Sequence, residues 1–337
     1  MTAPTATPAQ SRTVRKYFSR RAVLACLIVV VASLIFASLM VGGYEISISG
    51  IMNEPAQREM FFISRIPRTL ALIFAAIAMS LSGVIMQMIT QNKFVEPTTA
   101  GTSQWSGLGL LVVLIVLPGA APLVRMSVAS LFAFLGTMLF LLVLRKVSIT
   151  SSIVVPLVGI MLGAVVGAIT TFLAGQFNLL QAMSTWRSGG FSSIVRGFYE
   201  PLWAVLIIAV LTFVLADRFT VAGLGKDLAT TIGIRYERVV LLGTTMVALA
   251  TGVTTSVVGF IPFLGLVVPN MISLLLGDNT RRNLPWVALT GVGLLLACDL
   301  VGRTVVAPKE IPASVILGAV GAVIFIVLVL RQRNVRR

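Results

Sequence analysis

Long apolar runs alternate with short polar segments along almost the whole chain. A helix that crosses a bilayer needs about 20 mostly apolar residues. The runs are continuous, whereas the strands of a membrane barrel alternate. The pattern therefore predicts an all-α polytopic membrane protein with about ten transmembrane helices. Their expected ranges are 22–41, 67–89, 102–117, 123–144, 153–174, 202–216, 239–258, a segment ending near 276, 284–305 and 313–330.

The predicted helices are flanked by two basic tails. Residues 1–21 are rich in Thr, Pro and Ala and then basic, so we expect a disordered tail there. Residues 22–331 form the transmembrane domain, and residues 332–337 form a second basic tail. With about ten helices, most Lys and Arg residues fall on the side of the tails. The positive-inside rule then places both termini in the cytoplasm.

The composition excludes several classes of function. Only 11% of the residues are charged, against about 25% in soluble domains. The net charge is +15, but the basic residues gather at helix ends, so we expect no nucleic-acid partner. The chain has no histidine, its two cysteines lie in apolar runs, and it has no GxxxxGK[ST] phosphate loop. We therefore expect no catalytic site and no metal site.

A polar island at residues 217–238 lies between two apolar runs. Within it, three apolar residues recur every four positions and share one side of a short predicted helix. Asp227 suits the first turn of that helix, and Gly233 suits its end. The pattern is typical of a short helix that a soluble, ATP-hydrolysing partner contacts and moves. A solvated connecting loop fits the local pattern equally well. The three apolar residues are Leu224, Leu228 and Ile232.

The stretch GFIPFLGLVVPN at residues 259–270 combines two prolines with two glycines inside an apolar region. Such a stretch predicts a helix that is interrupted within the membrane, where protein or a cavity must satisfy the freed backbone groups. The residues of interest are Pro262, Gly265, Pro269 and Asn270.

A few charged residues stand out near the predicted outer side. Asp299 lies four residues before Arg303, so the two can pair along one helix face. A structural pair is favoured over a proton relay. Arg65, Arg68 and Arg303 run against the positive-inside bias. They either reach lipid headgroups or dock an acidic surface of an extracytoplasmic partner.

Several long segments resemble the FecCD-type permeases, the membrane subunits of ABC importers for iron-siderophores, haem and vitamin B12. They follow in order over nearly the whole chain after the N-terminal tail. The segments are RIPRTLALIFAAIAMSLSGVIMQ (65–87), NKFVEPTTAGTSQWSGLGLL (92–111), GKDLATTIGI (225–234), VVGFIPFLGLVVPNMISLLLGDNTRR (257–282) and CDLVGRTVVAPKEIPASVILGAVGAVIF (298–325).

The resemblance implies an architecture and partners. It implies a non-enzymatic permease in the bacterial cytoplasmic (inner) membrane, paired with a second copy or a sister permease. Two ATP-binding subunits carry ATP and Mg²⁺, so this chain needs no cofactor, and a siderophore-binding lipoprotein or periplasmic protein docks outside. The implied docking residues are Arg65, Arg68 and Arg303; the ATPase-coupling residues are Leu224, Gly225, Asp227, Leu228, Ile232 and Gly233; the cytoplasmic gate is Thr150, Ser151 and Ser152.

The substrate expectation depends on one departure from the family pattern. Residues 268–270 read VPN where many members read APH. With the segments around residues 94 and 217, this resembles the branch for catecholate and mixed-type ferric siderophores. Haem and vitamin B12 stay open as alternatives within the family. A transporter driven by an ion gradient is the alternative from another class, because Asp299 and the interrupted helix are features that such transporters use.

Overall fold

The computed structural model describes residues 20–43, 47–147 and 153–335, and every regular element in these ranges is helical. The elements are α1 (Arg20–Met40), α2 (Ile48–Asn53), α3 (Pro55–Met60), the π-helix η1 (Phe61–Arg65), α4 (Ile66–Ile89), α5 (Thr102–Val116), α6 (Pro122–Lys146), α7 (Val154–Gln176), α8 (Leu180–Ser188), the 3₁₀-helix η2 (Glu200–Trp203), α9 (Ala204–Ala222), α10 (Lys226–Thr231), α11 (Tyr236–Val257), α12 (Leu264–Leu276), α13 (Thr280–Thr304) and α14 (Ala313–Val335).

Many of these helices are long and apolar enough to cross a membrane. Among the described residues, seven candidate spans meet that test, and three shorter apolar helices accompany them, Thr102–Val116, Leu264–Leu276 and Ala313–Leu328. The all-helical, multi-pass architecture predicted from the apolar runs is therefore confirmed. The expected count of about ten spans stays a prediction.

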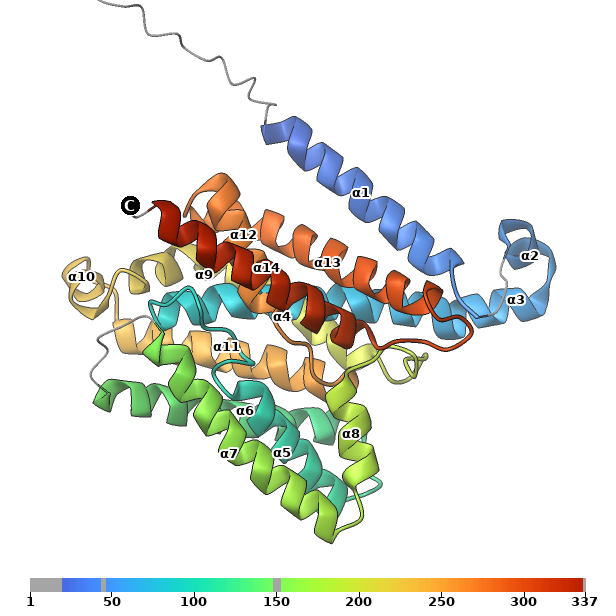
Figure 1. Ribbon diagram of the computed structural model, residues 1–337, viewed down its shortest axis with the longest axis horizontal. Helices are drawn as coiled ribbons and strands as arrows, with labels where there is room; N and C mark the ends of the chain where they lie inside the picture. Colours follow the sequence, from blue (N-terminus) through green and yellow to red (C-terminus); the bar gives the residue numbers. More distant parts are fainter. Residues whose placement is uncertain (1–19, 44–46, 148–152, 336–337) are drawn as a thin grey trace, which may run out of the picture.

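The helix α4 occupies the centre of the bundle, with α9, α11, α12 and α13 packed around it (Figure 1). Small residues allow this, because Ala71, Ala75 and Ala76 are fully buried and keep the neighbouring helices close. The closest approach joins Gly83 of α4 to Gly265 of α12. A Cβ atom added at Gly83 would lie 1.9 Å from the Gly265 carbonyl oxygen, so only glycine fits there.

A second group of helices packs beside this centre. The helix α6 lies between α5 and α11, and α7 packs on α5 and α6. Buried hydroxyl groups join the helices: the Thr102 and Thr137 oxygens lie 2.7 Å apart, and Ser106 hydrogen-bonds Thr255. Hydroxyl pairs of this kind hold helices together where lipid offers no competing hydrogen bond.

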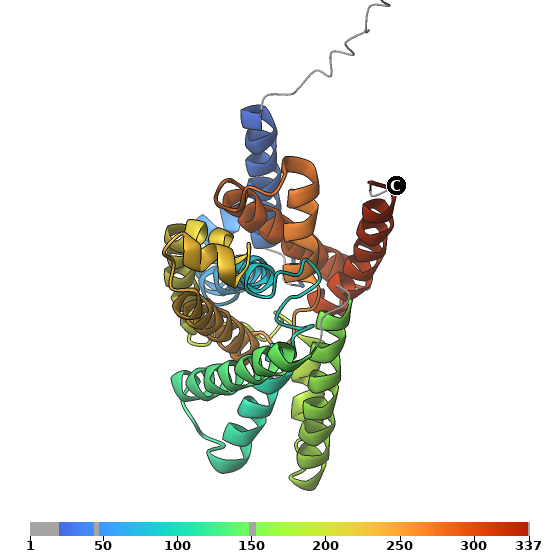
Figure 2. The same cartoon turned by 90° about the vertical axis from the view of Figure 1, so that its left-hand side faces the viewer.

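The functional regions lie at opposite ends of the helices. The start of α1, the segment α10 and the end of α14 lie toward the left of Figure 1, whereas α2, α3 and α8 lie toward the right. Viewed from that left end, α7 and α14 run along the same side of the molecule (Figure 2). The left end carries the expected ATPase contact, and the right end carries the arginines.

The second predicted helix begins much earlier than residue 67. Helices α3, η1 and α4 follow without a break from Pro55, because a π-turn at Phe61–Arg65 accommodates Pro67. Proline cannot donate to the carbonyl four residues before it, here Ile63. That carbonyl instead accepts the backbone N–H of Arg196 at 2.9 Å. The Ile63 carbonyl that Pro67 leaves free thus connects η1, at the start of the α4 helix, to the loop before α9.

Two other boundaries differ from the sequence expectation. The helix α9 continues to Ala222 instead of ending near 216, so residues 217–222 of the polar island are helical. The interruption predicted between residues 259 and 270 lies at 258–263, and Pro269 stands inside α12. Its missing N–H frees the Gly265 carbonyl, which accepts a hydrogen bond from the Gln87 side chain at 3.3 Å.

Candidate functional site

The polar island forms a compact coupling segment, residues 217–238, which runs from the last turns of α9 through α10 to the first turn of α11. Asp227 lies in the first turn of α10, and Gly233 follows its end with φ +86°, as the sequence predicted. Gly225 has φ +108°, so glycines adopt the turn on each side of α10. The apolar residues of the segment are largely exposed: Leu224 by 57%, Leu228 by 55% and Ile232 by 63%.

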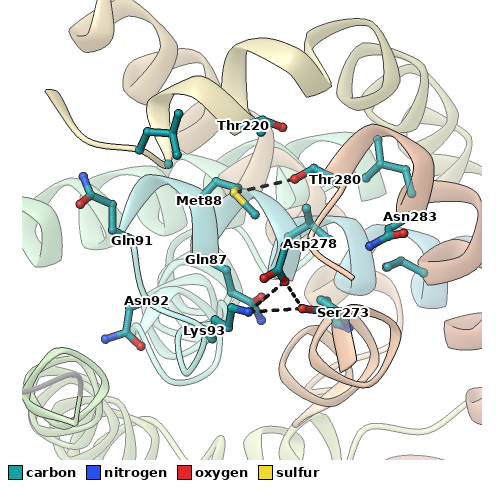
Figure 3. Close-up of a pocket in the computed structure, with 16 residues that line it drawn as sticks. Gln87, Met88, Gln91, Asn92, Lys93, Thr220, Ser273, Asp278, Thr280 and Asn283 are labelled. Carbon is teal, nitrogen blue, oxygen red and sulfur yellow. Dashed lines mark hydrogen bonds and ion pairs between the residues drawn. The ribbon is translucent and has the colours of Figure 1, made fainter. Parts of the chain in front are cut away.

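A cavity of about 280 Å³ lies behind the coupling segment. Thr220, Gly223 and Leu224 form one part of its wall, and residues of α4, α12, α13 and the turns after α4 and α12 form the rest. Figure 3 shows Lys93, Ser273 and Asp278 linked at its edge, with 2.9 Å between Lys93 Nζ and Asp278 Oδ1. The Ser273 hydroxyl and the Lys93 ammonium hold the pKa of Asp278 below its ordinary value. The coupling segment therefore has room to move against these helix ends.

A buried charge network, which we call the arginine cluster (Arg65, Arg68, Asp299, Arg303 and Glu310), occupies the opposite end. Arg68 binds Asp299 at 2.8 Å and Glu310 at 3.0 Å. Arg303 donates from Nε to the other Asp299 oxygen at 2.7 Å and from Nη2 to the Ser38 hydroxyl at 2.8 Å. The predicted pairing of Asp299 with Arg303 is confirmed.

The three predicted docking arginines lie together, but their side chains point into the protein. Arg65 is only 7% exposed and Arg303 only 5%. Both donate hydrogen bonds to the backbone oxygen of Val41 at the end of α1. The sequence missed this use of α1, because a carbonyl acceptor leaves no mark in the residue pattern. The cluster thus joins α1, α4 and α13 within one chain, and docking through it stays a prediction.

Glu310 is the part of the arginine cluster that is most open to solvent. It lies in the turn between α13 and α14 and also accepts a hydrogen bond from the Ser192 hydroxyl. Burial alone raises the pKa of Glu310, but the Ser192 hydrogen bond and the Arg68 charge outweigh it, so its pKa lies below the ordinary value. Glu310 therefore stays ionised on Arg68 at neutral pH.

The interrupted helix is capped by an acid that the sequence reasoning overlooked. Glu96, in the turn between α4 and α5, is fully buried and accepts the backbone N–H of Phe263 at 2.9 Å. Asn270 donates to the backbone oxygens of Lys93 and Leu266, both at 2.7 Å. The sequence offered one signal for Glu96, an acid in the turn FVEPTTAG between two apolar runs.

Helices α7 and α14 run along one side of the bundle (Figure 2). Large apolar side chains of α7 point outward there, including Leu157, Met161 and Phe172. The predicted gate residues Thr150, Ser151 and Ser152 lie outside the residues that the structure describes. Their role therefore stays a prediction.

The helical spans define a multi-pass, all-helical membrane protein. The model of the FecCD transport family matches residues 27–331. The chain therefore belongs to the FecCD transport family, as the resemblance predicted.

The curated relatives match over most of their length. The chain is 46% identical over 322 residues to the petrobactin import system permease protein FatD of Bacillus anthracis, covering 96% of this chain and 94% of that protein. It is 39% identical to the ferric-anguibactin transport system permease protein FatD of Vibrio anguillarum, covering 92% and 98%. An inward-facing putative metal-chelate type ABC transporter has a TM-score of 0.78 at 25% identity, covering 92% of this chain and 99% of that chain.

The arginine cluster yields a stability prediction. Asp299→Ala leaves the buried Arg303 without its carboxylate, and an uncompensated buried charge costs about 3–5 kcal/mol. We expect a clear drop in the thermal unfolding temperature of the detergent-solubilised protein. Asp299→Asn keeps a hydrogen-bond acceptor and should lie between Asp299→Ala and the unmodified protein.

The matched control is Asp217→Ala, which breaks the exposed pair between Asp217 and Arg281. Exposed pairs contribute about 0–1 kcal/mol, so this variant should unfold close to the unmodified protein. Equal unfolding temperatures for Asp299→Ala and Asp217→Ala would show that the arginine cluster does not stabilise the fold.

Proposed function

We propose that this chain is the membrane-spanning subunit of a binding-protein-dependent ABC importer for ferric siderophores, with catecholate or mixed-type chelates as substrates. The observation that carries the proposal is the match over nearly the whole chain to permeases that import petrobactin and anguibactin. The exposed apolar face of the coupling segment supports it independently, because a protein outside the membrane must cover that face.

The proposed assembly contains two permease chains, either identical or sisters, with two ATP-binding subunits on the cytoplasmic side. In it this chain has about ten membrane helices and lies in the bacterial cytoplasmic (inner) membrane with both termini inside the cell. That topology is supported by the common end at which α1 begins, α14 ends and α10 lies (Figure 1). ATP and Mg²⁺ belong to the partner subunits, this chain carries no cofactor, and a siderophore-binding lipoprotein or periplasmic protein docks outside.

The proposed mechanism uses the coupling segment as a lever. ATP binding closes the partner ATPases, and α10 moves with the surface that covers Leu224, Leu228 and Ile232. The cavity beside Gly223 and Leu224 leaves space next to the turn before α10, and α9 and α11, which pack on α10, carry the displacement into the bundle. Helices α7 and α14 of the two permease chains then separate or approach, so that the pathway opens to one side at a time.

A transporter driven by an ion gradient receives little support from the charges. Each Asp299 oxygen accepts a hydrogen bond from a different arginine, and a Glu96 oxygen accepts the Phe263 N–H. A proton relay needs an acid that binds and releases a proton during transport. Asp299 is instead held between Arg68 and Arg303. Glu96 caps the start of α12 through one of its two oxygens.

Reconstitution tests the proposed function directly. Vesicles that contain this chain alone should not accumulate a ferric siderophore under a proton or sodium gradient. Vesicles that also contain the ATPase subunits and the loaded binding protein should accumulate it only with ATP. A panel of ferric petrobactin, ferric anguibactin, haem and vitamin B12 identifies the substrate. Accumulation by the chain alone would overturn the proposal, and ATP-driven uptake of haem or vitamin B12 only would overturn its substrate class.

The coupling face yields a second prediction. Leu228→Asp puts a charge at the centre of the exposed apolar face, and burying an unpaired carboxylate against a partner is strongly unfavourable. We expect at least tenfold less ATP-driven uptake at unchanged permease abundance, together with weaker binding of the ATPase subunits. The control is Thr230→Asp, which adds the same charge on the opposite side of α10. Equal losses in both variants would argue against a specific contact at Leu228.

The docking role of Arg65, Arg68 and Arg303 needs a test that leaves the buried ion pairs of the arginine cluster intact. Reversing the charge of Arg68 would place a second carboxylate against Asp299 and would disturb the fold. Glu310→Gln instead removes only the partly exposed internal carboxylate from Arg68. If an acidic residue of the binding protein takes the place of Glu310, the variant should bind it severalfold more tightly, and most clearly at low salt.

Affinity is measured between the binding protein and the permease complex in nanodiscs. Glu59→Gln, which removes an exposed acid of α3 at the same end, is the matched control for net charge. Equal effects of Glu310→Gln and Glu59→Gln, or weaker binding by Glu310→Gln, would contradict docking at Arg68.

A further inference from the structure

A basic residue faces the open side of α7 near the arginine end of the bundle. Helix α8 folds back on α7, and Arg187 lies in its last turn. The side chain lines a cavity of about 930 Å³ and an adjoining cavity of about 610 Å³. Thr170 and Thr171 of α7 line both, and Val315 of α14 lines the smaller one. Both cavities therefore lie along α7, and the smaller one also lies along α14, the two helices that move in the proposed mechanism.

Small residues of α7 line the middle of the larger cavity. Gly163, Ala164, Gly167 and Ala168 lie there, between the larger Ile160 and Phe172 of the same helix. Gly167 lies nearest, because a Cβ atom added there would be 3.5 Å from a guanidinium nitrogen. A bulky ligand can therefore reach the guanidinium from the open side.

The charge of Arg187 is not neutralised within the described part of the chain. It is the one charged residue that lines either cavity, and no ion pair to an acidic side chain is formed there. Its hydrogen bonds, to the Gly167 carbonyl at 3.4 Å and the Thr171 hydroxyl at 3.3 Å, are long. A guanidinium group carries five N–H donors, so most of them stay available to a ligand.

The segment that carries Arg187 is held firmly. The neighbouring Trp186 donates its indole N–H to the Thr255 carbonyl of α11 at 2.7 Å. On the other side, the Ser314 hydroxyl of α14 hydrogen-bonds the carbonyls of Ser188 and Gly189. The base of Arg187 is therefore fixed between α11 and α14, while its tip extends into the cavity. A surface arginine that only meets lipid headgroups does not need such anchoring.

We propose that Arg187 is an anion-contact residue of the transport pathway, which binds the negatively charged oxygen shell of a ferric catecholate or catecholate–carboxylate chelate. This inference rests on the proposed function and names the chemistry of its substrate. Catecholate oxygens carry more negative charge than Fe³⁺ neutralises, whereas three hydroxamates just balance it. A planar guanidinium matches paired anionic oxygens with two parallel hydrogen bonds. The contact therefore favours anionic chelates over neutral ones.

The test uses the full importer in vesicles, with ferric petrobactin and saturating binding protein. We expect Arg187→Glu to lower the maximal uptake rate at least tenfold and Arg187→Gln severalfold, while Arg187→Lys keeps most of it. Affinity for the binding protein and ATP hydrolysis stimulated by it should stay unchanged, because Arg187 lies in the cavity. The matched control is Arg196→Glu, which reverses an exposed arginine of the α8–α9 loop that lines neither cavity.

The outcomes separate this inference from the proposed function. Full uptake by Arg187→Glu beside an active unmodified importer overturns the role of Arg187 and leaves the proposed function standing. Equal losses in Arg187→Glu and Arg196→Glu also overturn it, because net charge then explains the effect. If every Arg187 variant, including Arg187→Lys, lacks folded protein by thermal unfolding, the residue serves the fold and the inference fails. No uptake of any ferric siderophore by the unmodified importer overturns the proposed function itself.

Discussion

The fold depends on satisfying the backbone groups that become free where a helix is interrupted inside the bundle. An unsatisfied N–H or C=O in an apolar medium costs several kcal/mol, so each break must find a partner within the protein. Between α11 and α12 that partner is Glu96, which accepts the Phe263 N–H. The side-chain amide of Gln87 in α4 donates to the Gly265 carbonyl. Because Gly83 lets α4 touch α12 at the same level, the central helix both supports the break and organises the helices around it.

The two ends of the bundle differ in which groups are satisfied within the chain. At one end the charges are paired within the chain: Arg68 and Arg303 share Asp299, and Glu310 occupies the remaining face of Arg68. At the other end Leu224, Leu228 and Ile232 of the coupling segment lie exposed, although burying one Leu or Ile side chain is worth about 1.5–3 kcal/mol. The arginine cluster is therefore stable without a partner, whereas the coupling segment gains stability only when another protein covers it.

The sequence predicts features with a local signature and misses those formed between distant residues. Continuous apolar runs located the spans, spacing by four paired Asp299 with Arg303, and Gly233 marked the end of α10. The spacing could not show that Arg68 approaches Asp299 from α4, because the two lie 231 positions apart. Nor could it show that Glu96 caps α12. The prolines predicted that a helix is disturbed, but they could not show which group donates a hydrogen bond to the freed carbonyl oxygen.

The position of α10 determines how a movement there reaches the proposed pathway. It packs mainly against α9 and α11, with glycines in left-handed turns on both sides, so it can tilt without unfolding either neighbour. Helix α11 in turn packs on α5 and α6, which carry α7. Because the Trp186 indole also bonds to the Thr255 carbonyl of α11, the same helix supports α8 and with it Arg187. A displacement of α11 therefore moves the wall of the cavity and its cation together, which couples the shape of the pathway to the place where an anionic substrate is held.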